Sequence, residues 1–352
     1  MFIRALASIS PQQSFGAVQL PATIAEYHSN RLSCIEPAYK DWIDPKMIRR
    51  MSRIIRMGVA TAASCLRQAG LETPDAIVTG SAYGCLDDTG VFLNRMIEFN
   101  EEMLNPTAFI QSTHNTVGAQ IALLVKCYGY NNTFAHRGFS FENALLDGIL
   151  LLKDREVNNV LVGAADEITD ISFGILNRFG IYRREAVSNL DLIANPGNGT
   201  IAGEGSTFFL LANEASAVDY AVLDAIHTFY KPRQVEDVAK EINLFLEAQS
   251  LSIKDISLVI TGMNGDIAND LLYLQLNTTI FRETSVLPYK QLCGEYPTSS
   301  AFALWYAATE LKAGTLEALL PARAAGSSNK KHVLIYNNYK NIHHSLFLVS
   351  SC

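Results

Sequence analysis

The sequence predicts an α/β protein made of two similar halves, and three observations support this prediction. The chain has 352 residues, 49% hydrophobic and 18% charged, so it can bury a large core. Patterns typical of strands and of helices alternate along its first part. The same alternation begins again at Tyr220. Because no low-complexity linker intervenes, residues 1–215 and 216–352 are predicted to form the N-terminal half and a shortened C-terminal half of one compact body.

Short apolar runs and helical periodicity predict the elements of the first half. Strands are predicted at residues 1–10, 76–80, 132–135, 159–163 and 207–211. Helices are predicted at residues 46–70, 116–125 and 142–153. In the first of these helices apolar residues recur along one side, and Gly70 ends the periodicity. Thr133 and Phe134 are expected to lie in a buried central strand that leads into the helix beginning near residue 140.

The second half repeats the alternation. Strands are predicted at residues 221–226, 258–261, 332–336 and 345–349. Helices are predicted at residues 235–248, 266–274 and 298–313. The polar run at residues 337–341 is predicted to be the turn between the last two strands.

Composition argues against several classes of protein. Acidic residues outnumber basic ones by 35 to 28, and a formal net charge of -7 argues against a general nucleic-acid-binding protein. The six cysteines lack the close spacing of a metal knuckle or a redox dithiol, so reduced thiols and a cytoplasmic location are expected. No apolar stretch reaches the roughly 20 residues of a membrane-spanning helix, and the first ten residues predict a strand rather than a signal peptide.

Four stretches of sequence carry a resemblance to a known family. Asn-Pro-Thr-Ala-Phe at 105–109 and Ser-Thr-His-Asn-Thr-Val-Gly-Ala at 112–119 come first. Val-Gly-Ala-Ala-Asp-Glu at 162–167 and Ala-Gly-Glu-Gly-Ser at 202–206 follow in order. In these motifs, and in their spacing to the turn at Gly138, the chain resembles the β-ketoacyl-acyl carrier protein synthases of the thiolase superfamily. The resemblance implies a thiolase-like five-layer αβαβα fold with two pseudo-symmetric halves.

The resemblance also implies where a catalytic site would lie, and three positions of that site are replaced. The family's nucleophilic cysteine corresponds to Gly138, which has no side chain to acylate. Its two histidines correspond to Gly262 and Glu295, although stabilising an enolate requires neutral imidazole donors. The family's lysine is kept as Lys290, and residues 337–341 replace a glycine-rich loop.

A member of this family without the cysteine and both histidines is expected to lack condensing activity. It is similar to chain-length factors, which pair with an active ketosynthase in fatty acid or polyketide biosynthesis, including aryl polyene and flexirubin-type pathways. The expected partners are that ketosynthase, or a second copy of the chain, and an acyl carrier protein whose phosphopantetheine carries the substrate. No bound cofactor, nucleic acid or membrane is expected. The family dimer implies an interface around residues 105–109 and 133–137.

Two alternatives remain open. One is an acyltransferase or thioesterase with a remodelled pocket, and the other is a homodimeric scaffold that binds an acyl chain or an acyl carrier protein. The acyltransferase or thioesterase would use Ser140, His136 or Glu295. The candidates for lining a pocket are Ser140, His136, Phe139, Lys290 and Tyr339. If Gly138 lacks only the side chain, the substitution Gly138→Cys is expected to restore a reactive thiol.

Other polar residues suggest weaker hypotheses. A basic stripe on the predicted first helix is a candidate for docking an acidic carrier protein, although a solvated helix face explains it equally well. It consists of Arg49, Arg50, Arg53 and Arg56. No metal site is expected, because His343 and His344 are adjacent on a strand and point to opposite faces. Cys293 is expected to be a buried structural thiol.

Overall fold

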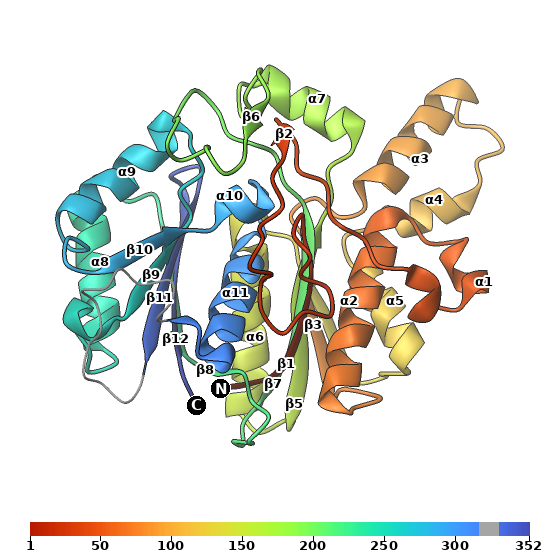
Figure 1. Ribbon diagram of the computed structural model, residues 1–352. Coiled ribbons are helices and arrows are strands. Elements are labelled where there is room, and N and C mark those ends of the chain that lie inside the picture. The colour runs from red at the N-terminus through yellow and green to blue at the C-terminus, as the bar shows by residue number, and fades with distance from the viewer. Residues whose placement is uncertain (317–330) are drawn as a thin grey trace.

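The structure, a computed structural model that describes residues 1–316 and 331–352, has five alternating layers (Figure 1). Two layers are formed by the sheets of the two halves, and a pair of helices lies between them. Further helices cover the outer faces. The predicted α/β architecture with five layers is therefore confirmed, and the two halves can be compared strand by strand.

The sheet of the first half contains five strands. They are β1 (Phe2–Ile9), β3 (Ala76–Gly80), β4 (Tyr130–Phe134), β5 (Asn159–Asp166) and β7 (Gly205–Ala212). Their spatial order is β1-β7-β5-β3-β4, with antiparallel pairing of β1, β7 and β5 and parallel pairing of β5, β3 and β4.

The sheet of the second half has the same order and the same pairing. Its strands are β8 (Ala221–Tyr230), β9 (Leu258–Thr261), β10 (Ser285–Pro288), β11 (His332–Tyr339) and β12 (His343–Ser350). They lie in the order β8-β12-β11-β9-β10, in which the first three pair antiparallel and the last three parallel. Pairing of β1 with β8 joins the two sheets. A separate small sheet consists of β2 (His28–Ser29) and β6 (Val187–Ser188).

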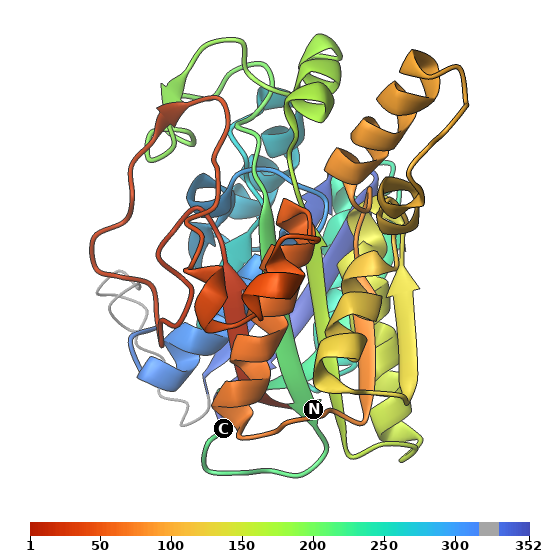
Figure 2. The same ribbon diagram turned by 90° about the vertical axis from the view of Figure 1, so that its right-hand side faces the viewer.

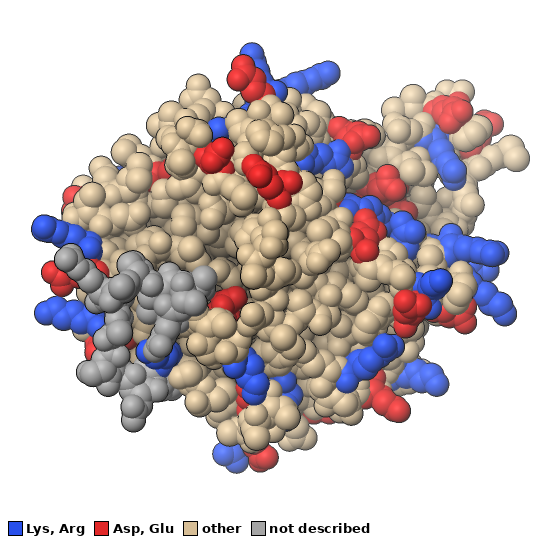
Figure 3. Space-filling view, in the orientation of Figure 1, with Lys and Arg blue, Asp and Glu red and all other residues tan. Residues whose placement is uncertain are grey.

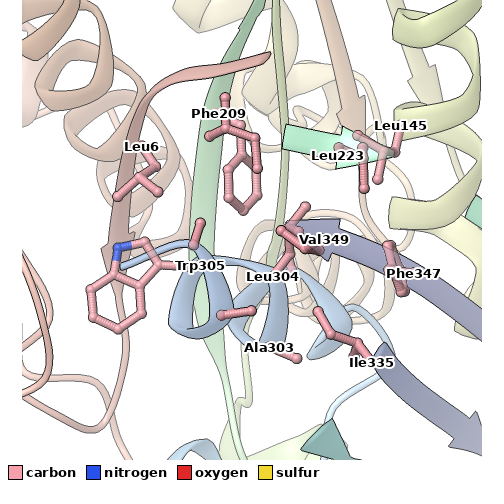
Figure 4. Packing of buried hydrophobic residues seen from close by; sticks show 14 of the residues in the cluster. Leu6, Leu145, Phe209, Leu223, Ala303, Leu304, Trp305, Ile335, Phe347 and Val349 are labelled. Carbon is pink, nitrogen blue, oxygen red and sulfur yellow. The ribbon is translucent and has the colours of Figure 1, made fainter. Parts of the chain in front are cut away.

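Helices α6 (Ser140–Lys153) and α11 (Ser300–Ala313) form the central layer. Helix α11 is buried from Ser300 to Leu311, which explains its almost uniformly apolar sequence. Its side chains pack with strand residues of both halves, as Figure 4 shows for Trp305 and Leu304 beside Phe209, Val349 and Leu223. The core is therefore shared between the halves.

The remaining helices lie outside the sheets or at their ends. Helices α2 (Arg53–Ala69) and α5 (Thr116–Val125) cover the first half, and α8 (Val235–Glu247) and α9 (Ile267–Thr278) cover the second. Shorter or peripheral helices are α1 (Pro45–Ile48), α3 (Leu86–Glu98), α4 (Pro106–Gln111), α7 (Asp170–Arg178) and α10 (Lys290–Cys293). The sequence analysis did not predict α3, α4 or α7. Among the described residues, no helix is long and apolar enough to cross a membrane.

Two predicted elements are wrong in detail. The helix expected over residues 46–70 is divided into α1 and α2, because Ser52 has an extended backbone and occupies the N-cap position of α2. The turn expected at 337–341 is shorter, because β11 continues through Tyr339. Asn337 and Asn338 lie in this strand and are buried, since the interior offers them polar partners: the Tyr289 hydroxyl donates to Asn337 Oδ1.

The expectation of a buried central strand at Thr133 and Phe134 is also wrong. Strand β4 is the last strand of the sheet and pairs only with β3 (Figure 2). Tyr130 and Asn131 are exposed, and the other residues of β4 are half-buried. The physical reason is that the described chain supplies no neighbour for the outer edge of β4, which leaves backbone N–H and C=O groups ready to pair with another chain.

Candidate active site

The turn from β4 into α6 has the form expected of a nucleophile elbow. A short 3-10 helix, Arg137–Phe139, connects the two elements, and Arg137 has a positive φ of 48°. Gly138 is buried at the centre of this turn. The Ser140 hydroxyl donates to the Arg137 carbonyl at 2.9 Å and accepts from the His136 N–H at 2.9 Å. The elbow is therefore present, but its reactive position carries no side chain.

Tyr339 occupies the space that a side chain at Gly138 would need. A Cβ atom built on Gly138 would lie 2.8 Å from both Cβ and Cδ1 of Tyr339, far closer than van der Waals contact. Tyr339 is the last residue of β11, and its hydroxyl lies 3.3 Å from that of Tyr83. Burial, together with Tyr83, raises the pKa of Tyr339, so the phenol is neutral. A residue more than 200 positions away in sequence thus fills the position of the nucleophile.

Gly262, which the resemblance assigns to the first histidine position, is crowded in a similar way. Gly262 directly follows β9, and a Cβ atom there would lie 2.5 Å from Asn337 Oδ1 and 2.8 Å from the Tyr273 hydroxyl. Tyr273 is fully buried and accepts a hydrogen bond from the Asn338 N–H at 2.8 Å. The glycine is required because an imidazole has no room at this position.

Glu295, which the resemblance assigns to the second histidine position, forms a buried ion pair. Its Oε2 lies 2.7 Å from Lys290 Nζ, and the two side chains are only 7% and 1% exposed. Asn264 Nδ2 donates to the same oxygen at 2.7 Å, and Lys290 also donates to the Asn338 carbonyl at 3.1 Å. The Glu295 carboxylate neutralises the charge of Lys290. It also places a hydrogen-bond acceptor where stabilisation of an oxyanion requires a donor.

A second buried carboxylate lies in the same region and has a structural role. Asp166, at the end of β5, accepts from the Ala82 N–H, the Thr298 hydroxyl and the Ser81 hydroxyl at 2.8, 2.8 and 3.2 Å. Burial raises its pKa to about 6, against the opposing effect of these hydrogen bonds. The carboxylate therefore connects the loop after β3 to the segment before α11.

The structure does not assemble the alternative nucleophiles. The Ser140 hydroxyl is used within its own turn, and the His136 ring stacks on Phe139 at 5.8 Å instead of approaching that hydroxyl. Cys293 is fully buried, as expected, and burial raises the pKa of its thiol well above the usual range. Among the described residues, no group of three or more His, Cys, Asp or Glu side chains is placed to hold a metal ion.

The four arginines do not form one exposed helical stripe, so the predicted stripe is wrong, and docking of a carrier protein at these residues stays a prediction. Arg49 and Arg50 are exposed between α1 and α2. Arg53 turns inward, because its guanidinium binds both carboxylate oxygens of buried Glu204 at 2.5 and 2.6 Å. Arg56 lies over the ring of Tyr39. Figure 3 shows basic and acidic side chains mixed in this region of the surface.

Several residues that fill the site were not predicted from the sequence: Tyr83, Tyr182, Asn264, Tyr273 and Asn337. They come from separate loops, a strand and helix α9, and only the fold brings them together. One feature of the sequence could have indicated them. Large polar and aromatic residues close to replaced catalytic positions suggest that these residues fill the volume that the catalytic side chains would occupy.

Comparisons with known proteins agree with this geometry. The family described as beta-ketoacyl synthase, N-terminal domain, matches residues 28–178. The ishigamide ketosynthase/chain length factor superposes with a TM-score of 0.80 at 15% identity, over 100% of this chain and 98% of that one. A beta-ketoacyl synthase from Burkholderia phymatum STM815 gives 0.73 at 15% identity, over 99% and 98%. No functionally curated protein matches significantly.

A further structure, AntDE:AntF, a type II polyketide acyl carrier protein in complex with its ketosynthase, gives a TM-score of 0.73 at 12% identity, over 100% of this chain and 99% of that one. The chain therefore has the fold of these ketosynthases over its whole length. Within it, residues 28–178 are similar to the β-ketoacyl synthase N-terminal domain family.

Proposed function

We propose that this chain is a non-catalytic subunit of the chain-length-factor type. The observation that carries the proposal is that all three catalytic positions are replaced and their space is occupied: by Tyr339 at Gly138, by Tyr273 and Asn337 at Gly262, and by an ion pair at Glu295. Loss of a catalytic nucleophile alone lowers a rate by a factor on the order of 10⁶. If the catalytic side chains were only missing, an empty pocket would remain. Here other side chains occupy that space, which stabilises the fold but supplies no catalytic group.

The proposed partner is an active β-ketoacyl-acyl carrier protein synthase, which would supply the missing cysteine and histidines. The unpaired edge of β4 and the apolar side chains near it support this pairing. On α4, Phe109 and Ile110 are 55% and 63% exposed, and on α5 Leu123 is 64% exposed. The ishigamide protein is named a ketosynthase/chain length factor, and AntDE:AntF a complex with an acyl carrier protein.

The proposed setting is fatty acid or polyketide biosynthesis of the aryl polyene or flexirubin type, in the cytoplasm. The acyl chain would arrive on the phosphopantetheine of an acyl carrier protein, with no other cofactor. Six free thiols, all within the described residues, are compatible with a reducing compartment. Of the alternatives, an enzyme based on Ser140 and His136 has no support in the geometry, whereas a homodimeric scaffold would use the same exposed β4 edge.

The test combines two measurements on purified protein. Incubation with an acyl thioester is expected to leave the intact mass of the wild-type chain unchanged. Coexpression with a ketosynthase that has the full Cys-His-His set is expected to give a stable one-to-one complex that forms ketoacyl product. Acylation of the isolated chain, or ketoacyl product made by it alone, would contradict the non-catalytic assignment. A homodimer that does not bind the coexpressed ketosynthase would favour the scaffold alternative.

A further inference from the structure

Three cations from separate parts of the chain lie together beside the filled site. Arg137 belongs to the elbow, Lys231 follows β8, and Lys340 lies in the turn between β11 and β12. The Lys231 N–H donates to the Ile342 carbonyl at 2.9 Å, so the two loops are in contact. Burial lowers the pKa of Lys340, Glu295 opposes this shift, and Arg137 adds to it through space. Their charges therefore act on one small region.

These cations have no counter-charge of their own. Within residues 1–316 and 331–352, none of the three forms an ion pair. The acidic group that acts on Lys340 is Glu295, and its Oε2 is already paired with Lys290. The three side chains therefore form a locally positive group, although the whole chain has a net charge of -7.

The backbone at all three cations is in a strained, left-handed conformation. Arg137, Lys231 and Lys340 have positive φ angles of 48°, 49° and 57°. Non-glycine residues rarely adopt this conformation, and where they do the strain is often associated with function. Each lysine is also held against a ring: Lys231 Nζ lies 5.2 Å from the centroid of Tyr230, and Lys340 Nζ lies 5.2 Å from that of Tyr339.

The surface between the cations is aromatic. The His343 ring contacts Phe139 edge-on at 4.7 Å and Tyr230 at 5.4 Å, and the His136 ring lies 5.8 Å from it. Burial lowers the pKa of His343, and the neighbouring positive groups lower it further. Aromatic rings bordered by an arginine and two lysines suit an anion that is attached to a less polar body.

We propose that Arg137, Lys231 and Lys340 bind the phosphate group of a phosphate ester. A phosphate carries up to two charges and several acceptor oxygens, which matches three cations better than a single carboxylate does. The ester is either a small free molecule or the phosphopantetheine arm of a carrier protein, and the second source rests on the proposed function. Such a site lies at the rim of the elbow and holds the arm without reacting with it.

Isothermal titration at low ionic strength tests the proposal with three probes: inorganic phosphate, 4'-phosphopantetheine and pantetheine. The wild type is expected to bind both phosphates and to bind phosphopantetheine about tenfold more tightly than pantetheine. The Lys231→Gln/Lys340→Gln variant is expected to lose this difference. The matched control is Lys254→Gln. Lys254 is exposed and lies in the short 3-10 helix that precedes β9, and the control is expected to keep the difference between the two affinities.

The probes also separate the two sources. Phosphopantetheine binding more tightly than inorganic phosphate indicates the carrier's arm, and equal affinities indicate the phosphate group alone. Equal affinity of wild type for phosphopantetheine and pantetheine, or unchanged phosphate affinity in the double variant, would overturn the proposal. The titration uses the isolated chain and no acyl donor. If the separate acylation test showed that the wild type is acylated, the proposed function would be contradicted, but the titration result on phosphate binding would still hold.

Discussion

At the residue scale, the site is defined as much by what fills it as by what is missing. Gly138 removes the nucleophile, and Tyr339 makes the removal difficult to reverse because its ring lies where the side chain would be. Glu295 likewise replaces an imidazole donor and binds the neighbouring lysine. The expectation that Gly138→Cys alone restores a reactive thiol therefore has to be changed.

Gly138→Cys by itself is expected to remain unreactive, whereas Gly138→Cys combined with Tyr339→Gly is expected to accept an acyl group. The second change makes room for a thiol at the start of α6, where the helix N-terminus lowers a thiol pKa. Intact mass after incubation with an acyl thioester measures the reaction. Wild type and Tyr339→Gly are the controls, since Cys352 is exposed and sets the background.

Neither variant is expected to condense its acyl group with a malonyl thioester, because Gly262 and Glu295 still supply no imidazole. Equal acylation of the single and double variants would show that Tyr339 moves aside freely. That result would contradict the role given to its ring.

At the element scale, one buried carboxyl group connects the central helices to the second sheet. Glu142, in the first turn of α6, accepts from Ser300 of α11 at 2.7 Å and from Ser345 of β12 at 2.9 Å. Its other oxygen is buried without a hydrogen-bond partner. Burial raises its pKa to about 7, although both hydroxyls oppose the shift.

This raised pKa predicts a stability that falls as pH rises. Between about pH 4.5 and 7 the unfolded chain loses the Glu142 proton before the folded chain does, so the folded state binds more protons. The free energy of unfolding therefore decreases across this range, and the cost above pH 7 is on the order of 3 kcal/mol. Below pH 4 both states are protonated and the cost is absent.

Glu142→Gln is expected to be more stable than wild type at pH 8 and similar to it at pH 4.5. Urea unfolding at several pH values measures the difference. Asp166 and Glu167, whose pKa values burial raises to about 6 and 7, remain in the variant and keep part of the slope. An identical pH slope in both proteins would show that Glu142 does not titrate in this range.

At the scale of the whole molecule, the two halves form one body whose sheet has two edge strands, and of these β4 has exposed residues whereas β10 is half-buried throughout. The strand order repeats in the two halves, which are joined through β1 and β8; the predicted division at residues 215 and 216 falls between β7 and β8 and stays a prediction. The second half ends its sheet at β10, whereas the first ends at β4 beside exposed apolar side chains.

If a ketosynthase pairs along β4, Ile110→Asp is expected to weaken the complex by tenfold or more, because a charge would be buried without a partner. Ile267→Asp on α9 is the matched control: this isoleucine is 54% exposed, similar to the 63% of Ile110, and lies on the other half. Light scattering after size-exclusion chromatography measures assembly. Equal losses for both variants would place the interface elsewhere.

The alternation of elements, the family resemblance and the three positions predicted to be replaced could all be read from the sequence, because each depends on local pattern and motif order. Strands such as 76–80 and the helix at 116–125 have the predicted bounds. Only the tertiary structure decided that β4 is an edge strand, that Arg53 turns inward to Glu204, and that Tyr339 fills the space at Gly138. The position of β4 depends on how the strands are ordered in the sheet, and the other two facts depend on contacts between residues more than 100 positions apart. No local pattern encodes which distant side chain occupies a vacated volume.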